Sequence, residues 1–226
     1  MQTFTVEDGN KFYDSRNGCN AIIETATGLL VSGCNTSTIP YGVTAIGEKA
    51  FEGRGLYSID IPSSVTSIGK LAFLLSDLTS LDIPSSVKSI GERAFSECIR
   101  LTSVTLRSSA VSLEEQAFYF SSIKDVYIYG SEMVENCGNK VFANIEDDAT
   151  LHVDASLVDK YKATSPWCDW FADIVALGGE TGIEKAEADT PSPCRIYSVD
   201  GKSLPMMQKG LNILRSKTGK CVKVMK

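Results

Sequence analysis

The sequence is poor in the residues that most catalytic and metal sites require. Its 226 residues include one histidine, His152, and two tryptophans. No two of its seven cysteines stand in C-x-x-C spacing, and neither of the phosphate-binding patterns G-x-x-x-x-G-K-[ST] and G-x-G-x-x-G occurs. A nucleophile–His–acid triad would have to use His152. We therefore expect a protein that is not an enzyme, with no catalytic residue, no cofactor and no metal site.

Clusters of basic residues and long apolar runs are also missing. The formal net charge is −6, and the lysines and arginines are scattered, so nucleic acid is not expected as a partner. No run approaches the roughly 20 apolar residues that cross a bilayer as a helix, so no transmembrane segment is predicted. No signal peptide is visible after Met1. The protein is therefore expected either to be cytoplasmic or to begin after a removed leader.

The most informative feature that is present is a repeat. Residues 59–73 read IDIPSSVTSIGKLAF and residues 81–95 read LDIPSSVKSIGERAF, with 11 of 15 positions identical at an offset of 22. The closing Ala-Phe pair recurs at Ala50-Phe51, Ala72-Phe73, Ala94-Phe95 and Ala117-Phe118. Four consecutive L-x-x-L-x-L patterns begin at Leu56, Leu78, Leu101 and Ile123. This pattern predicts an α/β repeat solenoid of leucine-rich repeats, each 22–23 residues long.

Each repeat is expected to contribute one short strand and one helical turn. In residues 80–83, alternation directs Leu81 and Ile83 to one face and Ser80 and Asp82 to the other. Residues 92–95, E-R-A-F, have room for about one helical turn. Because one repeat cannot bury both its strand face and its phenylalanine, stacking should give one continuous core and a parallel β-ladder. Strands are predicted at Phe4-Val6, Ile59-Ile61, Leu81-Ile83, Val104-Leu106, Val126-Ile128 and Leu151-Val153, with a weaker one at Ser37-Ile39.

Both ends of the repeat domain, residues 1–177, depart from the repeat. Residues 13–36 form a module in which residues 19–34 are predicted to be a β-hairpin with its turn near Ala26-Thr27. In this hairpin, Ile22 and Ile23 are expected to face Leu30 and Val31. Residues 154–177 are predicted to form a helical cap with Ser156 as the N-cap residue. The apolar residues of this cap are Leu157, Val158, Tyr161, Trp167, Trp170 and Phe171.

The composition changes after residue 177. Residues 178–193 are small and polar and include prolines, so we interpret them as a linker. Residues 194–226 are predicted to form a small β-rich tail with strands at 195–199, 211–214 and 221–225 and a turn at Asp200-Gly201. Roughly 30 residues bury little core alone.

Two of the cysteines are candidates for a disulfide. Cys19 and Cys34 fall opposite each other in the predicted hairpin, where directly opposed residues approach disulfide distance. Two semi-buried thiols are the alternative, and the sequence does not choose between them. Cys98 aligns with Ser76 and Ser121, so we expect a small buried side chain there.

The repeats, with L-x-x-L-x-I-P-x-x-V-x-x-I-G-x-x-A-F, resemble the BspA-like leucine-rich repeats of bacterial surface proteins. The segment YDSRNGCNAIIETATGLLVSGC, residues 13–34, is similar to a module that recurs in that family. In the tail, IYSVDGKSL, KGLNIL and KCVKVMK resemble parts of the C-terminal sorting segments of proteins exported by the type IX route. The resemblance implies a secreted or surface-exposed protein, and the family includes adhesins that bind host or neighbouring-cell proteins.

The strand alternation also predicts where a partner binds. The middle residues of the strands should form one column on a shared face: Asp60, Asp82, Thr105, Tyr127 and His152. A parallel column should lie beside it: Ser58, Ser80, Ser103, Asp125 and Thr150. A patch five strands wide is on the order of 20 Å long, enough for a modest protein interface, although a merely solvated sheet face is the alternative.

Two functions follow from this pattern. The first is a protein-binding surface module, similar to an adhesin, that uses the shared strand face. The second is a glycan-binding or scaffold component of a surface assembly, in which the tryptophans or the hairpin make the contact. Capping of the repeat core explains the tryptophans without a ligand.

Overall fold

The structure, a computed structural model, describes residues 3–178, 195–197, 203–204, 211–215 and 221–225. The chain divides into two compact units, Met1–Gly179 and Glu180–Lys226. The first unit contains all the repeats, and the second contains the tail. Residues 179–193 of the predicted linker and the predicted turn at Asp200-Gly201 lie outside the described residues.

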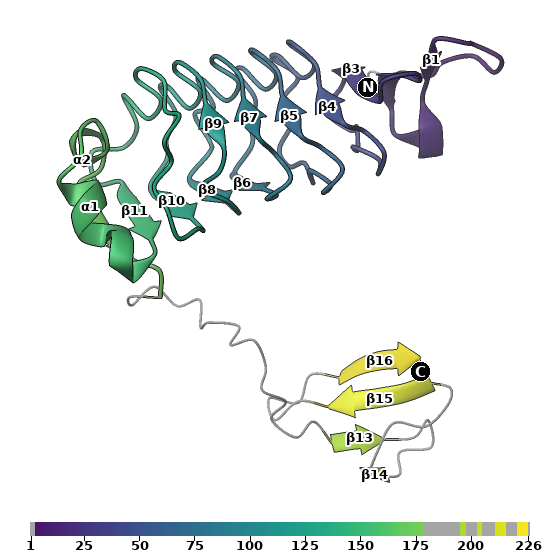
Figure 1. Ribbon diagram of the computed structural model, residues 1–226. Coiled ribbons are helices and arrows are strands. Elements are labelled where there is room, and N and C mark those ends of the chain that lie inside the picture. Colours follow the sequence, from purple (N-terminus) through teal and green to yellow (C-terminus); the bar gives the residue numbers. More distant parts are fainter. Residues whose placement is uncertain (1–2, 179–194, 198–202, 205–210, 216–220, 226) are drawn as a thin grey trace. The chain divides into compact units, whose positions relative to one another are not determined.

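The first unit is a row of similar coils (Figure 1). Successive coils contribute strands to a parallel ladder of five, in which β6 and β12 form the two edges. The strands are β6 (Ser80–Ile83), β8 (Ser103–Leu106), β10 (Asp125–Ile128), β11 (Thr150–Val153) and β12 (Asp173–Ala176). The predicted repeat solenoid is therefore confirmed.

A second parallel ladder, built from shorter strands, runs along the same row of coils and was not predicted. Its two-residue strands are β4 (Ala45–Ile46), β5 (Ser67–Ile68), β7 (Ser89–Ile90) and β9 (Ser112–Leu113). The last residue of each strand is buried, because the isoleucine or leucine before the glycine position points into the coil. These short strands also join the coils that precede β6, where the five-stranded ladder has not yet begun.

A continuous column of phenylalanines runs through the core. Phe51, Phe73, Phe95, Phe118 and Phe142 are all fully buried. Neighbouring rings are stacked, with centroids 5.0, 5.0, 5.2 and 5.0 Å apart. Because this separation is close to the spacing of strands in a sheet, one phenylalanine per coil fills the core without a gap.

The predicted helical turns of the repeats are wrong. Arg93 adopts a left-handed backbone conformation, with φ at 53°, and residues 92–97 form successive turns. The N–H groups of Arg93, Phe95 and Glu97 donate to carbonyls of residues 115, 117 and 119 in the next coil, at 3.0, 2.8 and 2.8 Å. These backbone groups pair between coils, so they are not available for the i→i−4 bonds of a helix.

Three predicted strands are absent. No strand is present at residues 4–6, 37–39 or 59–61. The five-stranded ladder therefore begins only at β6. Side chains hold the first of these segments, since the N–H of Phe4 donates to Asn20 Oδ1 at 2.6 Å and that of Val6 to Ser15 Oγ at 3.1 Å.

The predicted hairpin is present. β2 (Ala21–Glu24) and β3 (Leu29–Gly33) pair antiparallel, and β1 (Tyr13–Asp14) flanks β2. Ile23 lies opposite Leu30 as expected, but a β-bulge places Ile22 opposite Ser32, so Val31 is not its partner. A 3-10 turn, η1 (Arg16–Gly18), precedes β2. Cys19 and Cys34 are buried thiols that are not joined in a disulfide.

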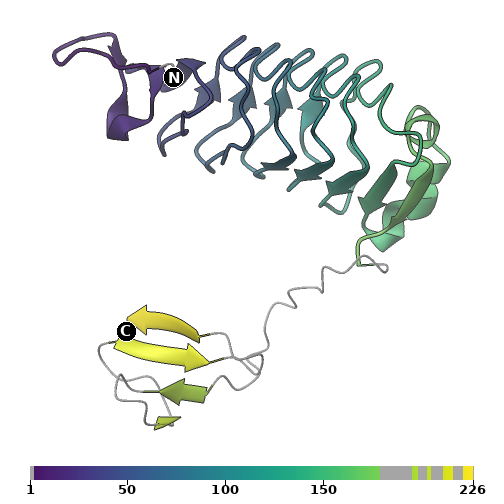
Figure 2. The ribbon, with the colours of Figure 1, turned by 180° about the vertical axis from the view of Figure 1, so that it is seen from behind.

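The cap closes the other end of the row (Figure 2). It consists of η2 (Ala155–Leu157), α1 (Val158–Lys162), α2 (Trp167–Trp170) and β12. Its first N-cap residue is Asp154, whose Oδ1 accepts from the Ser156 N–H at 2.9 Å, so the prediction of Ser156 is wrong by two positions. Of its apolar residues, Leu157 and Tyr161 are buried and Val158 is half-buried.

The second unit is an antiparallel sheet of order β14-β13-β15-β16 in its described residues. Its strands are β13 (Arg195–Tyr197), β14 (Ser203–Leu204), β15 (Leu211–Arg215) and β16 (Cys221–Met225). The three predicted strands are present, and β14 is additional.

Candidate functional site

The five-stranded ladder brings most of the predicted site residues into two columns. Its register pairs Asp82 with Thr105, Thr105 with Tyr127 and Tyr127 with His152. The second column runs from Ser80 through Ser103 and Asp125 to Thr150. β12 extends both columns by one residue, with Val175 beside His152 and Asp173 beside Thr150.

The solvent-accessible part of this face is smaller than predicted. Asp82 and Ser80 are exposed, and Thr105 and Tyr127 are half-buried. His152 has only 2% of its surface exposed, so the expectation of a histidine that contacts a partner is wrong. Its position beside β12 in the cap explains the burial, because the ladder continues past it.

His152 instead holds the far end of the face together. Its ring stacks on that of Tyr127, with centroids 4.3 Å apart and an interplanar angle of 12°. Its Nε2 lies 2.9 Å from Asp125 Oδ1. These two contacts fix the ring of Tyr127 and the carboxylate of Asp125, which are the two half-buried neighbours on the preceding strand.

Arg107 is a site residue that the strand alternation did not reveal. It directly follows β8, and its Nε and Nη2 donate to the two carboxylate oxygens of Asp82 at 2.9 and 2.6 Å. Hydrogen bonding to the Asp82 carboxylate raises the pKa of the Arg107 guanidinium. The same guanidinium lies over the ring of Tyr129, 5.3 Å from its centroid. The alternation rule considers only residues within strands, so it omits Arg107 and Tyr129, which directly follow β8 and β10. The signal that could have identified Arg107 is its positive charge, one coil after Asp82.

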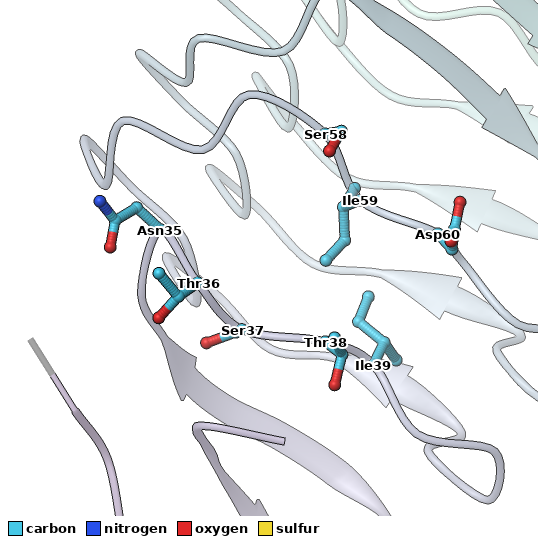
Figure 3. Close-up of a pocket in the computed structure, with 8 residues that line it drawn as sticks. All are labelled: Asn35, Thr36, Ser37, Thr38, Ile39, Ser58, Ile59 and Asp60. Atoms are coloured by element: carbon cyan, nitrogen blue, oxygen red, sulfur yellow. The ribbon is translucent and has the colours of Figure 1, made fainter. Parts of the chain in front are cut away.

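Asp60 and Ser58 lie on the coil before the ladder. Both are exposed, but residues 58–61 form no strand, so these two residues continue the columns only in sequence. They line a pocket of about 390 Å³ between residues 35–39 and residues 58–60 (Figure 3). Its walls carry hydroxyl, amide and carboxylate groups together with Ile39 and Ile59. A second pocket of about 260 Å³ lies on the other side of the segment, between residues 59–61 and the group Asp82, Pro84 and Arg107.

The other candidate groups are structural. Trp167 is buried against the end of the phenylalanine column, with its ring centroid 5.9 Å from that of Phe142, so it does not offer a stacking platform for a sugar. Cys98 is fully buried, and burial raises the pKa of its thiol to about 11. Among the described residues, no group of three or more His, Cys, Asp or Glu could hold a metal ion. Within the same part of the chain, no helix has the length and apolar character needed to span a membrane.

The comparison with known families is decisive for the repeats. A family model described as the BspA type leucine-rich repeat region matches residues 31–147 in six copies. The chain belongs to this family. The BspA-type repeats therefore include the coils that carry Asp60, Asp82, Arg107 and Tyr127, and residues 13–30 of the hairpin module precede them.

Two solved structures resemble the BspA-type chain weakly. A leucine-rich repeat protein from Bacteroides ovatus ATCC 8483 shares 16% identity, with a TM-score of 0.28, over 62% of this chain and 54% of its own. A leucine rich cell surface protein from Faecalibacterium prausnitzii A2-165 also shares 16% identity, with a TM-score of 0.34, over 98% of this chain and 61% of its own. The chain thus spans less than two thirds of either protein. No curated protein matches it.

Proposed function

We propose that this chain is a non-enzymatic, adhesin-like module, secreted or displayed at a bacterial cell surface, that binds a host or neighbouring-cell protein. The proposed binding surface is the face of the ladder around Asp82, Thr105 and Tyr127, bordered by Arg107 and Tyr129. The resemblance of the repeats to bacterial surface proteins supports the location, and the tail residues that are similar to a sorting segment support export.

The observation that carries the proposal is the arrangement of Tyr and Arg side chains on this face. Tyrosine and arginine are the residues most often found as energetic anchors in protein interfaces, with tryptophan. Here Asp82 holds the guanidinium of Arg107, which lies over Tyr129, and His152 holds the ring of Tyr127. Such fixed side chains lose little conformational freedom when a partner binds.

The glycan-binding alternative has less support. It relied on the tryptophans or on the hairpin. Trp167 is buried in the cap, and Trp170 is partly buried and packs against the core. The scaffold alternative also uses a protein partner and is covered by the same experiment.

The test is binding to a panel of purified extracellular proteins, run beside a glycan array. For the protein that binds, Tyr127→Ala and Arg107→Ala should each weaken the affinity about 30-fold, which corresponds to roughly 2 kcal/mol at an interface anchor. Tyr41→Ala is the matched control, because Tyr41 has 78% of its surface exposed and lies outside the ladder. Circular dichroism melts of each variant verify folding. Unchanged affinity in both folded variants, or binding to glycans alone, would contradict the proposal.

A further inference from the structure

The five-stranded ladder does not extend to the two coils that precede β6. Residues 36–39, 58–61 and 80–83 occupy the same place in successive coils, each ending at a proline position, yet only the last forms a strand. In the part of the chain that the structure describes, the N–H and C=O groups of residues 58–61 neither donate nor accept a hydrogen bond. From β6 onwards, equivalent groups pair with the neighbouring strand.

The side chains at the equivalent core position are also slightly more exposed in these two coils. Ile39 and Ile61 have 7% and 9% of their surface exposed, whereas Ile83 and Leu106 have 2% and 0%. The phenylalanine column does not loosen at these coils, since Phe51 and Phe73 remain 5.0 Å apart. The coils therefore separate only on the side of the five-stranded ladder.

This separation leaves a groove on each side of residues 58–61. The pocket with residues 35–39 is the larger, at about 390 Å³, and in Figure 3 the side chains of Ile39 and Ile59 both point into the space between the two segments. Polar groups of Asn35, Thr36 and Thr38 line the same space. The smaller pocket beyond residues 59–61 reaches the Asp82–Arg107 pair.

An extended peptide fits this chemistry. A row of unpaired N–H and C=O groups in an extended segment binds another extended backbone, as in strand addition at a sheet edge. Asp60 is exposed and forms no salt bridge in the described part of the chain, while the acid beside it, Asp82, is neutralised by Arg107. Asp60 is thus the acid that remains for a basic side chain of the peptide.

We propose that residues 58–61 receive an extended segment of the partner protein as an added strand, with a lysine or arginine of that segment at Asp60. The added strand lies in the groove between residues 35–39 and 58–60. Its apolar side chains contact Ile39 and Ile59, and its backbone pairs with the N–H and C=O groups of residues 58–61. This inference rests on the proposed function, since it names the kind of segment that a protein partner would present.

The probes are acetylated hexapeptides that alternate valine and threonine and carry lysine, alanine or glutamate at one central position. Calorimetry on the full chain should show the lysine peptide binding about tenfold more tightly than the glutamate peptide, equal to about 1.4 kcal/mol. N-methylation of alternate amides in the lysine peptide should abolish binding, because it removes the donors of the added strand. Amide hydrogen exchange at residues 58–61 should slow when the lysine peptide is present.

Asp60→Lys should weaken the lysine peptide about tenfold, which again corresponds to about 1.4 kcal/mol. Asp147→Lys makes the same charge change at an exposed acid in a coil near the cap and should leave the affinity within about twofold, less than 0.5 kcal/mol. Equal binding of the N-methylated peptide, or equal affinity in Asp60→Lys, would overturn the inference. A glycan that protects residues 58–61 where no peptide does would also overturn it.

The proposed function is tested separately. If Tyr127→Ala weakens a protein partner while Asp60→Lys does not, the proposed function stands and the added strand is wrong. If the lysine peptide binds as expected while Tyr127→Ala and Arg107→Ala leave the protein partner unaffected, the ladder face is wrong and the groove is retained.

Discussion

At the scale of single residues, the core depends on one aromatic ring per coil. Phe95 is fully buried and stacks on Phe73 and Phe118 at 5.0 and 5.2 Å. Since the core is only one layer deep, no second layer of side chains can collapse into the space that a smaller residue leaves.

Phe95→Ala should therefore lower the free energy of unfolding of the repeat unit by roughly 3–5 kcal/mol, as expected for a buried phenylalanine removed from a core. Urea denaturation followed by circular dichroism measures this change. Phe120→Ala is the matched control, because Phe120 has 54% of its surface exposed, and it should cost less than about 1 kcal/mol. Equal losses in the two variants would mean that the stacked column is not a main source of stability.

Residue-scale prediction from the sequence was successful where the period of 22 and the strand alternation both apply. They identified Leu81, Ile83 and Phe95 as buried and Asp82 as exposed. They failed for His152, because the strand alternation gives its direction but not the additional strand β12 beside it. They also omitted Arg107, whose partners lie on other coils and therefore leave no local pattern.

At the scale of elements, nearly identical segments adopt different structures. Residues 59–62 read I-D-I-P and residues 81–84 read L-D-I-P, yet the first segment forms no strand, whereas residues 81–83 lie in β6. The difference comes from the neighbours, since β6 has β8 to pair with, whereas residues 58–61 are flanked by grooves. A segment forms a β-strand only when a neighbouring segment pairs with its backbone. A sequence repeat therefore predicts that a coil forms, but not whether its backbone pairs with that of the next coil.

The cap shows how an irregular element is tied to the last coils. Tyr161 of α1 is fully buried, and its hydroxyl accepts a hydrogen bond from the Val134 N–H at 3.0 Å. Val134 lies in the loop between β10 and β11, so this bond joins the cap helix to a coil 27 residues earlier. Burial raises the pKa of the Tyr161 hydroxyl, which stays neutral at physiological pH.

Tyr161→Phe should destabilise the repeat unit by roughly 1–3 kcal/mol, because it leaves the buried N–H of Val134 without an acceptor. Thermal and urea melts of the full chain measure the loss. Tyr41→Phe removes the same hydroxyl from an exposed ring and should change stability by less than about 0.5 kcal/mol. A Tyr161→Phe protein as stable as the control would show that this bond does not secure the cap.

At the scale of the whole molecule, the repeats form one compact unit and the tail forms another. We propose from the sequence that the tail is a sorting segment. If the tail serves export and anchoring, it should contribute nothing essential to the folding of the repeats.

Deletion of residues 182–226 should leave the melting temperature of the repeat unit within about 2 °C, which corresponds to less than about 1 kcal/mol for a protein of this size. The same deletion should abolish labelling of intact cells by an antibody against the repeats. Unfolding of the repeats on deletion would show that the tail is an integral part of the cap. Undiminished labelling would remove the sorting proposal.

The bonds between coils have a mechanical consequence. In both parallel ladders the hydrogen bonds join one coil to the next, so they run along the row. Tension applied between the two ends of the repeat unit would pull these bonds lengthwise and in series. The weakest contact in the series would yield first, and each coil released would lengthen the molecule by about 22 residues of extended chain, up to roughly 75 Å. A surface protein built this way would extend in steps under shear flow while its remaining coils stay folded.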